Sequence, residues 1–460
     1  MSEKGLKYIS FGGLTATIVL LIAATIIEKL EGSSFALTYV YHSPAFIVLL
    51  GITATSALLY IARARAIRLF LLHCSLAIIL CGALISFLTA GHGEMILAKD
   101  AVPASMFVEN SCKLEKFPFR MRLIETATLY DREGMPTDHI AKIEIQDKEE
   151  EAVFTLSMNN PIKKDGYTFC IKSHSPDAVS LLVAHDPLGR IVTYTGYTLF
   201  IIFFTLTMLS RKSLFCALQH KEEDNGNHAA TPIGKVLYTA SVILFIAIGI
   251  AGAIRWYRIG LFPVTNGHEA MVFIAWCSLL AGVVCGKKKS FFLPTMFTLS
   301  ATTLAAALFT RENSAAHVLP ILRTPLLGIH VTCVILSYTI TGFLAINALI
   351  AIFHSDARRV AQLANTGRRL LYPATILLFA GIFIGSVWAE ISWGRYWGWD
   401  PKEVWALITL LSCSLPLHTR SIPQLARPIV FHYFCLVLFL AMLFTYLGVN
   451  YFLGGMHAYL

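Results

Sequence analysis

The sequence predicts an all-α polytopic membrane protein of about eleven transmembrane helices, with one small β-rich domain outside the cytoplasm. Three observations support this prediction. Hydrophobic residues make up 56% of the 460 residues and charged residues only 14%, a balance that a soluble fold could not bury. The apolar residues gather in runs suited to crossing about 30 Å of hydrocarbon. A single long polar stretch, at about 91–189, interrupts these runs.

The apolar runs define the expected spans. They fall near residues 8–27, 44–62, 68–90, 190–209, 234–254, 268–286, 291–309, 326–353, 369–389, 403–417 and 428–447. The run at 403–417 is short for a span. The first run is too long for a removed signal peptide and lacks a small-residue cleavage site, so we expect it to be retained.

The placement of lysine and arginine predicts the orientation of the spans. If the N-terminus lies inside, the inner segments carry Lys4, Lys7, Arg63, Arg65, Arg68, Arg211, Lys212, Lys221, Lys235, Lys287, Lys288, Lys289, Arg358, Arg359, Arg368, Arg369, Arg420 and Arg427. The short outer loops carry fewer positive residues, so we expect the C-terminus outside. This topology explains the net charge of +9, so the charge gives no reason to expect nucleic acid as a partner. Membrane lipid is an expected partner of the chain.

The polar segments predict the domain organisation. Residues 91–189 alternate apolar and polar side chains in places and contain turn signals such as Asn160-Pro161, which indicates the β-rich domain. The polar residues 211–233 resemble a flexible linker. We therefore expect a four-span module at 1–210 and a seven-span module at 234–460.

The most unusual stretch is residues 393–403, which we call the aromatic segment. It contains Trp393, Trp397 and Trp399 together with Tyr396, between two apolar runs. Aromatic rings are common where a membrane meets water, but a usual belt has only one or two per helix end. Glycines at 394 and 398 would let the backbone display the rings as a surface. An interfacial belt and a platform for a flat apolar ligand such as haem both stay open.

Asp400, within the aromatic segment, is also open to two interpretations. Pro401 follows it directly, and Glu403 follows three residues after it. Asp at the N-cap, Pro at the first helical position and Glu at the third make a capping box that would open the next helix. This pattern favours a structural cap over a catalytic acid, and one residue could serve both roles. No residue of the chain is assigned as a general acid or base.

Histidines in the expected spans are candidate ligands, because an imidazole at membrane depth needs a partner, water or a metal. His73 and His418 fall near the inner ends of their spans, at comparable depth. His330 opens the eighth span from outside, and His457 lies in the outer C-terminal tail. Two imidazoles on opposite faces of a haem would give a six-coordinate iron. A backbone carbonyl could equally satisfy any one ring.

Cysteine spacing and missing motifs exclude several functions. The ten cysteines include no Cys-x-x-Cys pair, so the chain has no site to carry c-type haem covalently itself. Cys112 and Cys170 both fall in the outer polar stretch, where a disulfide is permitted but not required. No Walker-type glycine loop and no zinc-type histidine cluster occurs, which argues against ATP-driven transport and zinc chemistry.

The aromatic segment resembles the tryptophan-rich WWD signature of haem-handling membrane proteins. Its Asp-Pro-Lys-Glu ending resembles the CcsA/ResC branch of the system II cytochrome c synthase. The resemblance covers most of residues 234–460. Within that part, the segments that resemble the family's histidine-bearing segments are 324–331 with His330, 417–420 with His418, and 448–459 with His457.

The first 210 residues resemble a shortened ResB module. Residues 41–46, His73 with 91–95, and 160–167 resemble that family's second span, third span and outer domain. The whole chain therefore resembles a compact fusion of both halves of the synthase. Two features depart from the pattern: the outer domain is much smaller than usual, and His268 stands where CcsA usually carries tyrosine. The roles of His268 and His42 are unassigned.

The resemblance implies cytochrome c biogenesis in a bacterial cytoplasmic membrane, with haem b as ligand and substrate. The implied haem contacts are His73 and His418 on the iron within the membrane, His330 and His457 on the iron outside, and Trp393, Trp397, Trp399 and Asp400 as the platform. The implied activity is that of a holocytochrome c synthase, a haem lyase that forms thioether bonds with the Cys-x-x-Cys-His motif of apocytochrome c. Thiol-reducing proteins would be further partners. The alternative is a haem exporter or chaperone without synthase activity.

Overall fold

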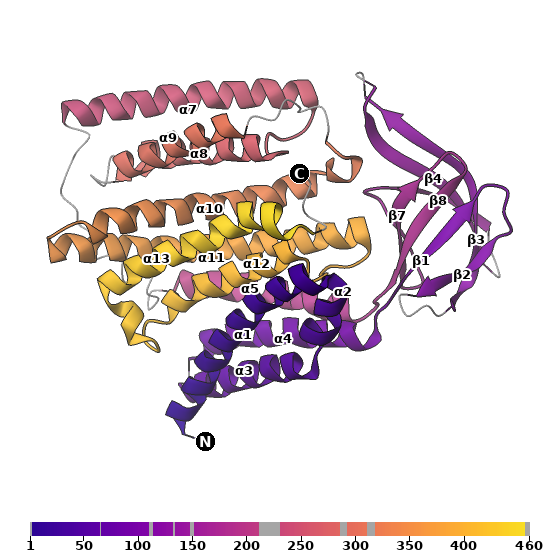
Figure 1. The fold of residues 1–460 in the computed structure, drawn as a ribbon, viewed down its shortest axis with the longest axis horizontal. Helices are drawn as coiled ribbons and strands as arrows, with labels where there is room; N and C mark the ends of the chain where they lie inside the picture. Colours follow the sequence, from indigo (N-terminus) through magenta and orange to yellow (C-terminus); the bar gives the residue numbers. More distant parts are fainter. Residues whose placement is uncertain are drawn as a thin grey trace.

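The structure is a computed structural model that describes residues 2–64, 66–109, 114–131, 134–147, 151–210, 231–285, 292–310 and 318–455. In these residues, ten helices are long and apolar enough to cross a membrane. The helices form one bundle, and an antiparallel sheet stands at one end of it (Figure 1). This arrangement confirms the predicted class of a polytopic membrane protein with one small β-rich domain.

The N-terminal part contributes four of the long helices. They are α1 (Glu3–Glu31), α3 (Pro44–Arg63), α4 (Ile67–Thr89) and α5 (Gly189–Met208); the short α2 (Ser33–Ala36) and the π-helix η1 (Leu37–Tyr41) connect α1 to α3. Local sequence sets several of these boundaries. The Ser2 and Ser43 side chains accept backbone hydrogen bonds at the N-caps of α1 and α3. Gly32, with a φ of 92°, ends α1 where a side chain would be strained.

The sheet connects α4 to α5. Its strands are β1 (Gly91–Ala98), β2 (Ala104–Glu109), β3 (Leu114–Tyr130), β4 (Pro136–Gln146), β5 (Glu151–Ser157), β6 (Ile162–Lys164), β7 (Tyr167–His174) and β8 (Ala178–His185). They lie in the order β5-β4-β3-β2-β1-β8-β7-β6. β1 and β8 pair along their whole length, from Gly91 with His185 to Ala98 with Ala178. Buried and exposed residues alternate along β3, so one face of the sheet encloses a core that includes Phe119, Met121 and Phe169.

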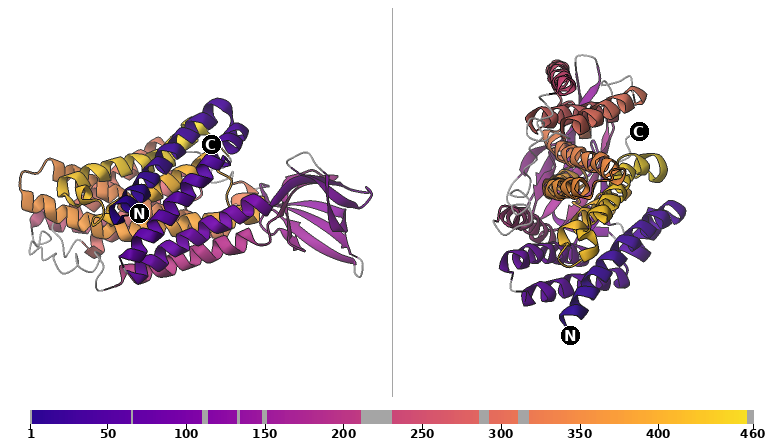
Figure 2. Two further views of the ribbon diagram at one scale, coloured as in Figure 1. Left: turned by 90° about the horizontal axis from the view of Figure 1, so that it is seen from below. Right: turned by 90° about the vertical axis from the view of Figure 1, so that its left-hand side faces the viewer.

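The C-terminal part contains the other helices of the described residues. They are α7 (Pro232–Ile259), α8 (Gly267–Cys285), α9 (Phe292–Phe309), the 3-10 helix η3 (Pro320–Leu322), α10 (Pro325–Ile352), α11 (Ala357–Trp393), α12 (Pro401–Ser414), the 3-10 helices η4 (Leu415–His418) and η5 (Pro423–Ala426), α13 (Pro428–Leu443) and the π-helix η6 (Phe444–Leu453). α10 lies at the centre of the bundle and α7 at the edge opposite α1 and α3 (Figures 1 and 2). The predicted linker at 211–233 lies almost wholly outside the described residues.

The shortest and the longest helices at the predicted spans are α12 and α11. α12 has 14 residues, about 21 Å, which is too short to count among the ten candidate spans. The 3-10 turn η4 extends it by about 8 Å, so the pair together reaches nearly the thickness of the hydrocarbon core. α11 has 37 residues and begins at Ala357, whereas the predicted span began at 369. The arginine-rich start of this segment is therefore helical as well.

The two parts of the chain pack against each other along their length. On one side, Phe200 of α5 stacks on Phe379 of α11 at 3.8 Å between ring centroids. On another, Trp405 of α12 donates a hydrogen bond from Nε1 to Thr25 of α1 at 3.2 Å. The sheet, the end of α11 and the last described residues all lie toward one end of the bundle (Figures 1 and 2). We call this end the sheet end.

Candidate functional site

Far from the sheet end, the structure brings His73 and His418 together. Their ring centroids lie 6.1 Å apart with the ring planes at 81°. His73 comes from α4 and His418 from η4, so each part of the chain supplies one ring. The ring of Phe11 from α1 lies edge-on to His418 at 5.5 Å. The expectation that the two histidines share a depth is confirmed, and we call them the inner histidine pair.

Both rings of the inner histidine pair are oriented in the same way. Nδ1 of His73 lies 2.8 Å from the carbonyl oxygen of Leu69, and Nδ1 of His418 lies 2.8 Å from that of Ser414. Because a carbonyl oxygen can only accept, each Nδ1 carries the proton and each Nε2 carries the lone pair. Histidines that bind metals are commonly held in this way, with the second ring nitrogen bonded to a backbone carbonyl. The pair is thus suited to bind iron through Nε2.

The aromatic segment leaves the end of α11 as a loop and ends at α12. Gly394, with a φ of 73°, stops α11 and lies so close to the sheet that an added Cβ would sit 3.0 Å from the Ala184 side chain. Trp397 lies edge-on to Trp399 at 5.7 Å, and Trp399 itself has a φ of 57°, unusual for a bulky residue. Trp393 lies edge-on to Trp388 of α11 at 4.9 Å. The tryptophan rings therefore form two separate edge-on pairs, one at the end of α11 and one in the loop before α12.

Asp400 acts as the N-cap of α12. Its Oδ1 accepts the backbone N–H of Lys402 at 2.9 Å, and the Glu403 carboxylate accepts that of Asp400 at 3.3 Å. The same Glu403 oxygen also accepts the backbone N–H of Gly398 at 2.8 Å. The predicted capping box is confirmed, and it fixes the backbone on both sides of Trp399. A further role of Asp400 toward a ligand stays a prediction.

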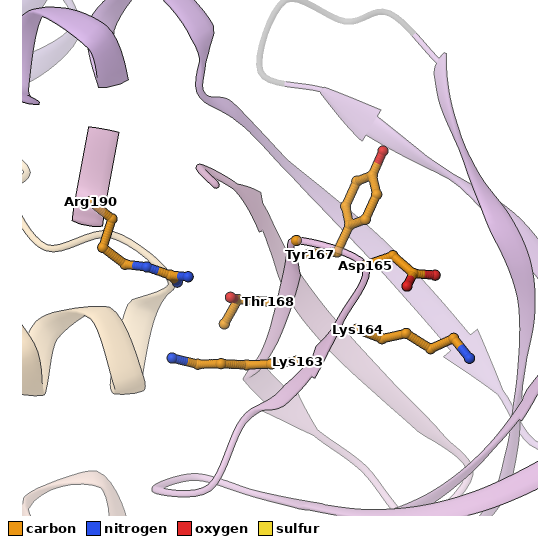
Figure 3. A pocket seen from close by; sticks show the side chains of 7 residues that line it. Lys163, Lys164, Asp165, Tyr167, Thr168 and Arg190 are labelled. Carbon is orange, nitrogen blue, oxygen red and sulfur yellow. The ribbon is translucent and has the colours of Figure 1, made fainter. Parts of the chain in front are cut away.

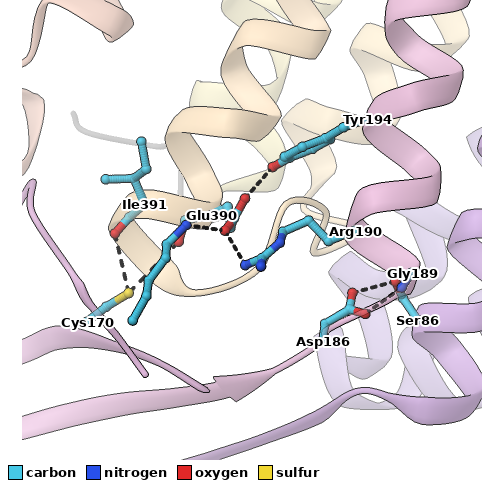
Figure 4. A network of polar contacts seen from close by, with 9 residues as sticks. Ser86, Cys170, Asp186, Gly189, Arg190, Tyr194, Glu390 and Ile391 are labelled. Atoms are coloured by element: carbon cyan, nitrogen blue, oxygen red, sulfur yellow. Dashed lines mark hydrogen bonds and ion pairs between the residues drawn. The ribbon is translucent and has the colours of Figure 1, made fainter. Parts of the chain in front are cut away.

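A buried carboxylate joins the aromatic segment to the sheet and to α5. The Glu390 side chain, 6% exposed, accepts hydrogen bonds from Lys163 of β6 at 2.9 Å, Arg190 at 2.6 Å and Tyr194 at 2.7 Å (Figure 4). The Cys170 thiol points at the neighbouring carbonyl of Ile391 at 3.3 Å. Glu390 lies one helical turn before Trp393. We call this cluster the Glu390 hub, and it sets the position of the aromatic segment against the sheet.

A second polar cluster fixes Tyr396 in the middle of the aromatic segment. The Tyr396 hydroxyl lies 2.9 Å from the Ser86 hydroxyl at the end of α4 and 3.2 Å from that of Thr193 in α5. Ser86 in turn donates to Asp186, which also accepts the backbone N–H of Gly189 (Figure 4). Burial raises the pKa of the Tyr396 hydroxyl, so it stays neutral and able to donate. The loop is therefore tied to both helices that border the sheet.

A pocket of 180 Å³ lies beside the Glu390 hub, lined by residues 163–168 and Arg190 (Figure 3). The volume is below the roughly 300–1,000 Å³ of pockets that bury a drug-sized ligand. Its cations are also already paired: Lys163 and Arg190 with Glu390, and Lys164 with Asp147 at 3.1 Å. Lys163 and Arg190 point toward one side and Lys164 toward the other (Figure 3). This pocket is thus a poor candidate for a haem site.

His330 lies against α11 rather than within the aromatic segment. Its Nδ1 donates to the carbonyl oxygen of Gly381 at 2.7 Å, and a Cβ added to Gly385 would come within 2.6 Å of the ring. Gly385 precedes Trp393 by eight residues, about 12 Å along a helix. As in the inner pair, Nε2 of His330 therefore carries the lone pair. The predicted start of its span at 326 is confirmed, since α10 begins at Pro325.

His457 lies outside the described residues, but the chain before it reaches the aromatic segment. A Cβ added to Gly455 would sit 2.5 Å from Oδ2 of Asp400, so the backbone passes directly over that carboxylate. Asn450 of η6 also accepts a hydrogen bond from Lys402 at 2.9 Å. The C-terminal segment is therefore attached to the first turn of α12.

The remaining residues singled out in the sequence have other contacts. His268 lies 2.9 Å, through Nδ1, from the carbonyl oxygen of Ala307 and so links α8 to α9. The ring of His42 packs on that of Phe87 at 4.9 Å. Cys170 is a free buried thiol, and Cys112 lies outside the described residues. Within the described ranges, no three side chains of His, Cys, Asp or Glu converge as they would for a metal ion, whereas a haem iron needs only two imidazoles from the protein.

Sequence reasoning missed the Glu390 hub and the residues that cover Trp399. Glu390 could have been singled out in the sequence, because a carboxylate at the end of an apolar span is energetically unfavourable unless it is paired. Its partners Lys163 and Arg190 lie in ordinary polar sequence, and no sequence pattern marks them. Tyr41, whose ring stacks on Trp399, stands at the end of η1; it belongs to the segment 41–46 that resembles a ResB span, but nothing in the sequence related it to Trp399.

Models of two known families match the chain. The model described as cytochrome C assembly protein matches residues 264–457, and the model of the ResB-like family matches residues 61–186. The first therefore contains the aromatic segment, His330 and His418. The second contains His73 and the sheet.

Similar curated proteins bear related names. The chain is 30% identical to cytochrome c biogenesis protein CcsA of Guillardia theta over 259 residues, which cover 48% of this chain and 84% of that protein. It is 31% identical to CcsA of Chlamydomonas reinhardtii over 252 residues, which cover 51% of this chain and 70% of that protein. It is 33% identical to protein NrfI of Wolinella succinogenes over 233 residues, covering 47% of this chain but only 25% of NrfI.

Proposed function

Because the chain belongs to the CcsA family of cytochrome c biogenesis proteins and carries a ResB-like part before it, we propose that it is a holocytochrome c synthase. In this proposal it moves haem b to the sheet end of the bundle and attaches it to apocytochrome c. The observation that carries the proposal is the inner histidine pair, because one ring comes from each part of the chain. If both rings bind one haem iron, the ResB-like part and the CcsA-like part would act together as a single unit.

The inner histidine pair would bind haem first. His73 and His418 both present Nε2 and lie where α4 meets η4. They would hold the iron from two sides, which keeps it six-coordinate and closed to oxygen chemistry. The rings and apolar side chains of the surrounding helices would cover the porphyrin.

The aromatic segment would receive haem next. Trp393, Trp397 and Trp399 would contact the apolar edge of the porphyrin, with Asp400 at the border of this surface. His330 and His457 would bind the iron. The Glu390 hub and Tyr396 support this role, because they hold the partly buried tryptophan rings in one place.

The attachment itself would be addition of a cysteine thiol to a haem vinyl group. A carbon–sulfur bond forms at the vinyl carbon nearer the ring, the vinyl double bond becomes single, and the thiol proton ends on the outer vinyl carbon. No electrons are gained or lost, but both thiols must be reduced, hence the expected thiol-reducing partners. The protein would contribute by positioning, while the porphyrin supplies the reactive carbon. The histidine of the Cys-x-x-Cys-His motif would replace one protein ligand on iron and so release the product.

The same topology gives the expected location. The family resemblance implies a bacterial cytoplasmic membrane, and the lysine and arginine bias favours an N-terminus inside it, with the sheet and the aromatic segment outside. The apolar outer faces of the bundle would contact lipid. Apocytochrome c would then meet the protein on the outer side.

Co-expression tests the proposal directly. This chain and an apocytochrome with one Cys-x-x-Cys-His motif would be produced in a host whose own haem-attachment genes are deleted. We expect haem that stays on the cytochrome in a denaturing gel, absent when both motif cysteines are serine. Haem bound by this chain without any covalent cytochrome would instead identify a haem exporter or chaperone.

A further inference from the structure

The turn that begins at His418 contacts two helices of the N-terminal part. We call residues 418–422 the His418 turn. The Tyr60 hydroxyl, in the last turn of α3, forms a hydrogen bond with the Ser421 hydroxyl at 3.2 Å. From α1, the ring of Phe11 lies edge-on to the His418 imidazole at 5.5 Å. One member of the inner histidine pair therefore lies on a turn that both α1 and α3 touch.

Backbone hydrogen bonds make the His418 turn compact. The N–H groups of Ser421 and Ile422 both donate to the carbonyl oxygen of His418, each at 2.8 Å. A side chain that holds Ser421 therefore also holds the backbone of the histidine three residues earlier. A 3-10 turn at the end of a helix is held by fewer and poorer hydrogen bonds than a helix interior, so such outside contacts matter for its position.

The two helices that contact the His418 turn are closely packed on each other. Ser10 of α1 donates a hydrogen bond to Ser56 of α3 at 3.2 Å, and both side chains are buried. A Cβ added to Gly13 would lie 2.2 Å from the hydroxyl of Thr53, so the helix backbones approach closely at this level. Ser10 directly precedes Phe11 in the chain. The contacts of α1 and α3 with the His418 turn therefore come from one rigid pair of helices.

The segment after the His418 turn is held by the C-terminal part itself. Arg368 of α11, only 7% exposed, donates from Nη2 to the carbonyl oxygens of Leu425 at 3.1 Å and Ala426 at 2.8 Å. Its guanidinium also lies over the ring of Phe431, at 4.8 Å from the centroid. The connection from η4 to α13 is thus fixed at η5 by α11, and Tyr60 contacts it closer to the ligand histidine.

We propose that Tyr60, assisted by Phe11, holds the His418 turn where its imidazole can bind the inner haem iron together with His73. This inference rests on the proposed inner haem site. Because α3 ends at Arg63 and α4 begins at Ile67, the helix that holds the His418 turn leads directly into the helix that carries His73. Tyr60 and Phe11 are positioning residues, since they act on haem only through His418.

The size of the expected effect has an upper limit. A contact that biases the turn toward its binding position can change the apparent haem affinity by no more than its own free energy. One hydrogen bond corresponds to about 3- to 10-fold in an equilibrium constant. Tyr60→Phe removes only the hydroxyl and should therefore weaken haem binding by about 3- to 10-fold, far less than removal of the His418 ring.

The test uses the full chain in mild detergent with His330→Ala, so that added haem reports mainly on the inner histidine pair. Haem affinity and the spin state of the iron would be measured for Tyr60→Phe, for Ser421→Ala and for both together. Each single change should weaken binding by about 3- to 10-fold and turn part of the iron high-spin, and added imidazole should restore the low-spin spectrum. The double variant should bind no more weakly than the weaker single one, because both changes remove the same hydrogen bond.

Tyr8→Phe is the matched control, because Tyr8 also lies on α1 but is 73% exposed. It should leave affinity and spin state unchanged, whereas Phe11→Leu should weaken binding in the same direction as Tyr60→Phe. If Tyr60→Phe does not fold, Ser421→Ala decides from the other side of the bond.

Parental affinity and spin state in both Tyr60→Phe and Ser421→Ala would overturn the inference, even if the thermal unfolding temperature falls, since Tyr60 would then only stabilise the bundle. Losses that add up in the double variant would overturn it as well, because the two hydroxyls would then act separately. By contrast, parental haem affinity in His418→Ala would contradict the proposed inner haem site itself.

Discussion

The inner histidine pair and the aromatic segment are built by different means. His73 and His418 are set by helices, and each ring is oriented by a carbonyl of its own chain four residues earlier. The aromatic segment is a loop whose position depends on the sheet and on α5, through the Glu390 hub and Tyr396. One site is thus specified by helix packing, whereas the other is specified by a few polar contacts between distant parts of the chain. The aromatic segment should therefore be far easier to displace by mutation than the inner histidine pair, without unfolding the bundle.

The largest effect is expected from removing a ring of the inner histidine pair. His418→Ala should weaken haem binding within the membrane by more than about 100-fold, since even lost partners of ligand histidines cost 10- to 100-fold. The bundle should still fold, because the ring is only partly buried. Haem content and the absorption spectrum of the purified protein measure the effect. Wild-type haem content in His418→Ala and in His73→Ala would show that the pair is not an iron site.

Glu390→Gln should separate the two sites. A buried carboxylate removed from its cations costs about 3–5 kcal/mol, and the lower value is expected here because Lys163 is half exposed and can turn to water. The aromatic segment should shift while the inner histidine pair keeps its geometry. Thermal unfolding and the spectra of the two haem sites would report this.

The control for Glu390→Gln is Glu125→Gln, which breaks the exposed pair between Glu125 and Lys142 in the sheet that also supplies Lys163. That variant should leave stability and spectra unchanged, because exposed pairs contribute little. Equal losses at the inner and the outer site in Glu390→Gln would refute the contrast between them.

Gly385→Ala should displace His330 alone. The added Cβ would come within 2.6 Å of the imidazole, and overpacking of this kind costs about 1–3 kcal/mol. The outer haem spectrum should change, with the inner one preserved. Gly51→Ala is the matched control, since a Cβ there meets nothing within 4 Å, and helix propensity makes it neutral or slightly stabilising. An unchanged outer spectrum in Gly385→Ala would mean that His330 does not bind the iron where the structure places it.

The smallest effect is expected at Cys170. Burial, together with the nearby Glu390 carboxylate, raises the pKa of its thiol to about 12. At pH 8 only about one thiol in ten thousand is then ionised, so alkylation of the native protein should be very slow and should speed up as pH rises. Cys170→Ala should leave haem attachment intact. The labelling rate would be measured by mass spectrometry, with the denatured protein as reference. Rapid labelling at pH 8 would mean that the contact between β7 and the end of α11 opens.

Sequence patterns predicted those parts of the molecule that depend on local composition. Hydropathy predicted the spans, alternation predicted the sheet, and Asp400 with Pro401 and Glu403 predicted the start of α12, which the structure confirms. The comparable depth of His73 and His418 was also predicted, because the order and orientation of the spans determine the depth of each residue in the membrane. The length of α11 was not predicted, because its charged first turns lie outside the apolar run.

The contacts of the aromatic segment could not be predicted in the same way. Glu390 meets Lys163 and Arg190, and Trp399 meets Tyr41, only after the sheet and both parts of the bundle have packed together. No periodicity in the sequence relates such distant residues. A paired carboxylate at a span end could have been expected, but the identity of its partners could not.

The most direct test of the account is the absorption spectrum of the full chain, purified in mild detergent with ample haem supply, before and after dithionite. The account predicts sharp low-spin spectra of iron with two imidazole ligands. His330→Ala and His457→Ala should alter only the outer component and recover with added imidazole, whereas His73→Ala and His418→Ala should remove the inner one. A protein that binds no haem under these conditions would contradict the account, and the aromatic segment would then be an interfacial belt.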